Sequence, residues 1–121
     1  MANNFKNAGA TSVSTQSGSP TTVYKANTLQ NGTGSALNSI LIELDVANTG
    51  SSAVAATVLL WKYDAVSPET WHVVKDAPIP AGSTLKVVSG QKIVLNGNDE
   101  IRIYATTATV DVIASILEDV N

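Results

Sequence analysis

The sequence predicts an all-β protein: a single antiparallel β-sandwich with an extended polar N-terminal arm, for which the jelly roll is one suitable topology. Three observations predict this class. Apolar and polar residues alternate with period two, turn-forming Asn, Gly, Asp and Ser recur between the alternating segments, and no long stretch has a helical period. Since 121 residues suit one domain, we expect residues 1–36 to form the arm and residues 37–121 the body.

The predicted arm is rich in Asn, Ser, Thr, Gly and Ala and has few apolar residues. Val13 and the pair Val23 and Tyr24 stand beside Ser or Thr, which is typical of one or two short edge strands. Either the body's own sheet or a neighbouring chain is expected to hold such a segment. Phe5 and these three residues are therefore candidates for an interaction surface.

Two long strands open the body. In "SILIELDVAN" the alternation predicts a strand whose core face is formed by Ile40, Ile42, Leu44 and Val46. "NTGSS" breaks the pattern and "AVAATVLLWKY" resumes it. One face of this second strand carries Val54, Ala56, Val58 and Leu60, and the other carries Thr57, Leu59, Trp61 and Tyr63. We expect the two strands to form a hairpin through "NTGSS".

Further strands follow at short intervals. "TWHVV" leads to "DAPIPAG", whose prolines indicate a sheet edge or a crossing between sheets. Residues 83–88, 91–95 and 100–105 are predicted strands, joined by the turn sequences "SG" and "NGND". In the last strand, "TVDVIASILEDV", the apolar face is formed by Val110, Val112, Ala114 and Ile116. Its opposite face carries Asp111, Ile113, Ser115 and Leu117.

Composition and charge exclude several function classes. The chain has no cysteine, so neither a disulfide nor a thiolate metal site can support the fold. Its net charge is −3, and all ten acidic residues lie in the body, whereas the arm carries only Lys6 and Lys25. We therefore expect no nucleic-acid partner. Neither a signal peptide nor a membrane span is predicted.

The sequence offers no catalytic or metal-binding constellation. His72 is the only histidine, no nucleophile motif accompanies it, and we assign it a structural place in a strand. Asp64 and Glu69 are interpreted as solvated loop carboxylates, and "NGNDE" as a hairpin turn, because it lacks the spacing of a calcium loop. The sequon at Asn31 has a meaning only in a secretory pathway. We predict a protein that is not an enzyme, without catalytic residues, metal or cofactor.

An aromatic cluster is the most distinctive candidate site. If residues 64–70 form a hairpin loop, Tyr63 lies opposite Trp71 and beside Trp61 on one face of the sheet. Such a patch can stack on sugar rings, which makes a glycan-binding module the alternative function of another class. It can equally cover a subunit contact or belong to a second buried face.

The C-terminal part of the chain supplies a resemblance. "DAPIPAGSTLKVVSGQKIVLNGNDEIRIYA", followed by "VDVIASILEDV", resembles segments of small virion proteins of tailed bacteriophages. The resemblance implies a structural β-sandwich of the particle, with capsid decoration or cement as the favoured role. A tail, neck or fibre-attachment component is the alternative. No catalytic or metal-binding residue is implied.

The resemblance also implies partners and a location. The chain is expected to be a virion component, assembled in the host bacterial cytoplasm, that binds the major capsid protein or tail and neck proteins. Self-association is expected, with a trimer as the favoured form, and polysaccharide is a further candidate partner. We hypothesise that residues 3–25 reach a neighbouring subunit or the capsid and add a strand to its sheet.

Overall fold

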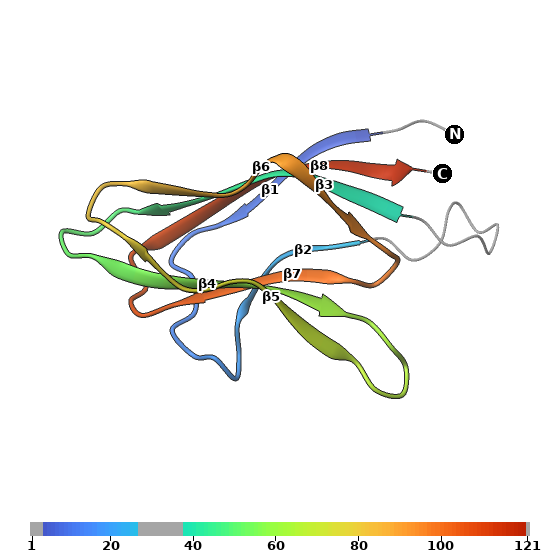
Figure 1. Ribbon diagram of the computed structural model, residues 1–121, viewed down its shortest axis with the longest axis horizontal. Helices are drawn as coiled ribbons and strands as arrows, with labels where there is room; N and C mark the ends of the chain where they lie inside the picture. Colours follow the sequence, from blue (N-terminus) through green and yellow to red (C-terminus); the bar gives the residue numbers. More distant parts are fainter. Residues whose placement is uncertain (1–3, 27–37, 121) are drawn as a thin grey trace.

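The computed structural model describes residues 4–26 and 38–120, so the sequon at Asn31 lies outside the described residues. The described residues form eight strands and no helix (Figure 1). The strands are β1 (Asn4–Ala10), β2 (Thr21–Lys25), β3 (Asn38–Asn48), β4 (Val54–Lys62), β5 (Glu69–Ile79), β6 (Thr84–Leu95), β7 (Glu100–Ala105) and β8 (Val110–Val120). They confirm the prediction of an all-β sandwich.

The strands are divided between two sheets that pack face to face (Figure 1). The terminal sheet has the order β1-β8-β3-β6, and the hairpin sheet has the order β2-β7-β4-β5. All neighbouring strands are antiparallel. The first strand pairs with the last, the second with the seventh, the third with the sixth and the fourth with the fifth. The chain is thus one long hairpin rolled into two layers, which is the jelly-roll topology.

Apolar side chains from both sheets fill the space between the layers. The core faces of β4 and β8 are those that the alternation predicted: Val54, Ala56, Val58 and Leu60 in β4, and Val110, Val112, Ala114 and Ile116 in β8. Burial of this set removes apolar surface from water and stabilises the pairing of the two sheets.

β3 and β4 lie in different sheets, so the prediction that they form a hairpin is wrong. The buried Asn48, at the end of β3, holds the connection. Its Nδ2 donates to the carbonyl oxygens of Ser52 (2.7 Å) and Ile79 (3.0 Å), and its Oδ1 accepts from the backbone N–H of Gly50 (2.9 Å). The link therefore turns the chain across the layers, and the two core faces pack against each other.

The core face of β3 also differs from the predicted one. Both ladders of β3 shift between Leu41 and Glu43, which marks a β-bulge at Ile42. The extra residue moves the alternation by one position, so Leu41 as well as Leu44 is fully buried. Ile40 and Ile42, which were expected in the core, are only half-buried.

The "SG" sequence forms a bulge instead of a turn. Residues 84–95 are one strand, and both halves pair with β3. Gly90 has a φ of +87°, and the ladder skips from Ser89 to Ile93 on this strand. A glycine in the left-handed region serves a bulge as readily as a hairpin turn, which explains why the prediction of two strands is wrong.

Turns at the prolines and at "NGND" connect the layers. β5 is an edge strand of the hairpin sheet and contains Pro78, and the chain then crosses to β6 in the terminal sheet. This confirms the predicted edge and crossing. The backbone N–H of Asp99 donates to the carbonyl of Asn96 (3.0 Å), so "NGND" is a turn, although it joins β6 to β7 in the other sheet.

The predicted arm is part of both sheets. β1 pairs with β8 and β2 pairs with β7, each at a sheet edge. β2 confirms the edge strand predicted at Val23 and Tyr24, whereas Val13 lies outside the strands and the first edge strand is formed by residues 4–10. Between them, the backbone N–H of Val13 donates to the carbonyl of Val110 (3.1 Å). The body's own sheets therefore hold the part of the arm that the structure describes.

A buried polar network joins the two sheets near the chain ends. The Tyr24 hydroxyl on β2 donates to Glu118 on β8 and also bonds to Ser39 Oγ on β3 (3.0 Å). Lys6 Nζ on β1 lies 3.7 Å from Glu118 Oε2. Because buried polar groups destabilise a fold unless they are paired, this network favours one fixed arrangement of these four strands.

The bulge in β3 yields a stability prediction. Leu41→Ala removes a fully buried side chain and is expected to destabilise the protein by about 2–5 kcal/mol. Ile40→Ala, one residue away on the outer face, is expected to have a much smaller effect. Urea unfolding of both variants, followed by fluorescence, measures the difference. Equal losses, or a larger loss at Ile40, would contradict the bulged register.

Candidate interaction surface

The arm residues proposed for an interaction surface divide into buried and exposed ones. Val13, Val23 and Tyr24 are buried in the chain's own core. They stabilise the sandwich and offer no surface to a partner in this fold. Phe5, in contrast, is 80% exposed on β1.

The three aromatic rings do not form one patch. In the β4–β5 ladder Trp61 lies opposite Thr70, and Leu60 lies opposite Trp71. The side chains of directly paired residues point to the same side of a sheet, so Trp71 lies on the side of Leu60 and Trp61 lies on the other side. Tyr63 does contact Trp61, with ring centroids 5.9 Å apart in an edge-on arrangement. The predicted pairing of Tyr63 with Trp71 is wrong, because the actual register differs from it by an odd number of residues.

Trp61 belongs to a polar cluster on the outer face of the hairpin sheet. Arg102 Cζ lies 4.4 Å from the centroid of the Trp61 ring, a cation–π contact. Arg102 Nε and Thr22 Oγ1 both donate to Glu100 Oε1, each at 2.9 Å. Burial raises the pKa of Glu100, but the hydrogen bonds from Arg102 and Thr22 and the charges of Arg102 and Lys25 outweigh it, so the pKa is lowered.

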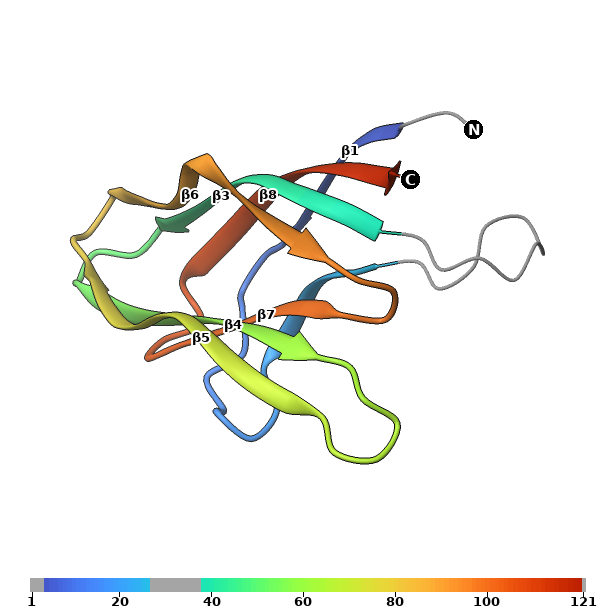
Figure 2. The same ribbon diagram turned by 45° about the vertical axis from the view of Figure 1, so that its right-hand side comes forward.

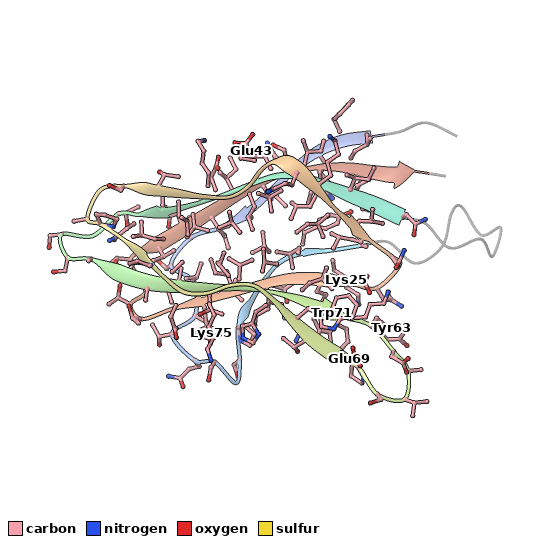
Figure 3. The ribbon with its side chains drawn as sticks, in the orientation of Figure 1. Lys25, Glu43, Tyr63, Glu69, Trp71 and Lys75 are labelled. Carbon is pink, nitrogen blue, oxygen red and sulfur yellow. The ribbon has the colours of Figure 1, made fainter. Side chains whose placement is uncertain are left out.

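The β4–β5 hairpin extends beyond the two layers (Figure 2) and carries exposed groups. Trp71 is 51% exposed, and its Nε1 donates to Glu69 Oε1 (3.0 Å); both side chains lie on this hairpin in Figure 3. At the tip, Asp64 Oδ1 accepts from the backbone N–H groups of Val66 and Ser67, and these bonds lower the pKa of Asp64. Asp64 is exposed in the loop, as predicted, whereas Glu69 is exposed but is the first residue of β5 instead of a loop residue.

A row of apolar side chains crosses the outer face of the terminal sheet. The ladders place Phe5 opposite Leu117, Leu117 opposite Ile40, and Ile40 opposite Val94, so the row spans all four strands. Directly opposed side chains have Cβ atoms about 4.5–5.5 Å apart, which makes the strip continuous. Val94 is 57% exposed at the end opposite Phe5. We call these four residues the apolar row; Ile113, 58% exposed, lies on the same face.

Charged residues lie beside the apolar row on the same face. Lys86 Nζ is 3.7 Å from Glu43 Oε2 and 3.6 Å from Asp45 Oδ1. Figure 3 shows Glu43 on the outer side of the terminal sheet, away from the hairpin that carries Trp71. An apolar strip with a polar margin is the usual anatomy of a protein–protein contact.

Sequence reasoning missed the apolar row, although part of the signal was present. Ile113 and Leu117 occupy the polar face of the last predicted strand, where two large apolar residues are unexpected. Ile40 was assigned to the core because the bulge after Leu41 leaves no trace in the alternation. Val94 could be placed on this face only through its pairing with Ile40.

The part of the chain that the structure describes contains neither a metal-binding cluster nor a membrane-spanning helix. Within residues 4–26 and 38–120, no group of three His, Cys, Asp or Glu side chains is arranged to hold a metal ion. None of the described segments is a helix with the length and apolarity needed to cross a membrane. His72 is exposed on β5. Surface hollows follow β1 and β8, and one is lined by residues 7–11 and 111–113.

No protein-family model matches the chain, and comparison with curated proteins and with solved structures gave no match either.

The cluster around Glu100 predicts a dependence of stability on pH. Because the folded-state pKa is lowered, the ionised carboxylate stabilises the fold above pH 4.5, and this contribution is lost as the pH falls below 4.5. Glu100→Gln should therefore lower the free energy of unfolding at neutral pH. As the pH falls below 4.5, the stability of this variant should decrease less steeply than that of the wild type. The measurement is thermal unfolding across this pH range. An unchanged slope for Glu100→Gln would contradict the interpretation.

Proposed function

We propose that this chain is a non-enzymatic structural protein of a tailed-phage particle, a capsid decoration or cement protein that binds neighbouring subunits through the outer face of its terminal sheet. The observation that carries the proposal is the apolar row. Phe5 and Val94 remain largely exposed at its two ends. Covering such a strip with a partner removes apolar surface from water, which favours association.

The fold and the resemblance support the same class. Jelly rolls occur in viral capsid domains and in lectins, but a fold by itself does not define a function. The resemblance of residues 76–119 to small virion proteins of tailed phages is what directs the proposal to the phage particle. The surface proposed for binding, the apolar row, is identified from the strand pairing of this chain.

The proposed contact uses a sheet face, whereas the hypothesis from the sequence had residues 3–25 reach a neighbouring subunit as an added strand. Residues 4–10 and 21–25 already donate and accept ladder hydrogen bonds within the chain. Phe5 is the one candidate residue of the arm that lies on the proposed surface. The N-terminal segment thus contributes to partner binding as a strand of the terminal sheet.

The structure favours this surface over the aromatic residues as a binding site. Arg102 covers one side of the Trp61 ring, and Trp71 lies on the other side of the sheet from Trp61. A flat platform of three rings for a sugar is therefore absent. A tail, neck or fibre-attachment role remains within the same class, and the number of copies in a particle separates it from decoration.

Quantitative mass spectrometry of purified particles tests the proposal. We expect hundreds of copies in a fixed ratio to the major capsid protein. Val94→Asp should greatly reduce the bound copies, because it places a charge in the apolar row. Val66→Asp is the matched control, since Val66 is 91% exposed on the hairpin loop outside the row.

The other outcomes are equally informative. A few to some tens of copies would place the chain in the tail, neck or fibres. Absence from the particle, or full binding of the Val94→Asp variant, would overturn the proposed contact.

A further inference from the structure

The four edge strands of the sandwich differ in how they are protected. Unprotected edges pair with other chains, and bulges, prolines and irregular backbone prevent this. β2 and β6 have register shifts, and β5 has shifts together with Pro78 and a positive φ at Asp76. β1 has none of these features. Its seven residues pair with β8 without a shift, and Lys6 is its only charged residue.

β1 is also self-complementary along its length. Phe5 projects from the outer face, 80% exposed. Gly9, four residues later on the same face, has no side chain; the fold itself requires a glycine there, because a Cβ would lie 2.6 Å from the Val112 carbonyl oxygen of the same chain. Beside Gly9 is the hollow lined by residues 7–11 and 111–113. Asn7 lies midway between the projecting ring and the hollow.

We propose that β1 pairs antiparallel with β1 of a second copy of this chain, about a twofold axis at Asn7. In this register Phe5 lies opposite Gly9 of the second copy, and each ring enters the other copy's hollow. Ile113, which lies opposite Gly9 in the β1–β8 ladder, gains an apolar neighbour. The contact is isologous, since the same residues serve both copies.

Charge favours the antiparallel direction. Lys6 lies near the start of β1, and just beyond its end Asp111 Oδ1 accepts from the backbone N–H of Ser12 (3.2 Å). In the antiparallel register about Asn7, each Lys6, which pairs with Glu118 of its own chain, lies opposite Ala8 of the other copy and not opposite the other Lys6. A parallel pair in register would place Lys6 beside Lys6, and like charges directly opposed are destabilising.

The size of the contact sets its strength. β1 contacts β2 at the corner of the sandwich, but among residues 4–26 and 38–120 its ladder hydrogen bonds run only to β8, so no described strand pairs with its other edge. Two Phe rings bury about 150–250 Å² each, and a strand pair of this length stays below the roughly 1,200 Å² of a standard interface. We expect a reversible dimer that increases with concentration. The pairing joins two terminal sheets into one, with both apolar rows on the same side, so a particle-bound dimer would bind through two faces.

The inference goes beyond the proposed function and is tested on the free protein, so either can fail without the other. The chain has no cysteine, so Asn7→Cys introduces a single thiol at the proposed axis. Directly opposed residues have Cα atoms about 4.5–5.5 Å apart, which suits a disulfide. Under mild oxidation this variant should form a covalent dimer rapidly. Thr11→Cys, displaced from its copy by eight residues or about 26 Å, and Lys75→Cys on β5 are the matched controls.

Sedimentation velocity over a concentration series gives the second readout. The wild type should shift from monomer to dimer, and Asn7→Lys, which opposes two positive charges at the axis, should stay monomeric. Circular dichroism verifies that this exposed position tolerates the change. A monomer at every concentration, a trimer, or cross-linking of Asn7→Cys no faster than the controls would overturn the proposal.

Discussion

The antiparallel pairing of β1 with β8 is the contact on which the rest of the jelly roll depends. It joins the first described strand to the last and closes the rolled hairpin of the chain. After β1, the chain places Val13 in the core and crosses to β2 in the other sheet. Tyr24 then reaches Glu118, and a hydrogen bond to a charged group contributes about 1.5–3 kcal/mol. The polar start of the sequence is thereby held in both layers.

The same pairing creates the outer face of the terminal sheet. Phe5 could have projected from a free arm, but β8 places it in line with Leu117, Ile40 and Val94. The exposed aromatic residues Tyr63 and Trp71 lie on the protruding hairpin of the other sheet (Figure 3). Two separate exposed regions therefore exist among the described residues, and of these two the terminal sheet combines a continuous apolar strip with charged neighbours. The contact proposed above therefore uses a sheet face of the domain, to which the N-terminal segment contributes as a strand.

Much of the fold was readable from local patterns. Period two gave the core faces of β4 and β8, and Pro78 marked an edge strand. The remaining features depend on pairing, which the sequence of one strand does not record. Ile42 enters a bulge that reverses the alternation of β3, and Gly90 bends a strand where a turn was expected. An odd difference in the register of β4 and β5 moves Trp71 to the other face. For this reason the prediction that Trp61, Tyr63 and Trp71 share one face was wrong, and the apolar row was not predicted.

Amide hydrogen exchange of the dilute, free protein, followed by NMR, tests the closure of the sandwich by its N-terminal strands most directly. The β1 amides that bond to β8, together with the amides of Val13 and Ala26, which donate to the carbonyls of Val110 and Asp99, should be protected to an extent comparable with the core of β3. Exchange of residues 4–26 at the rate of an unstructured chain, while β3 and β4 stay protected, would contradict the closed jelly roll and return this segment to the role of an arm.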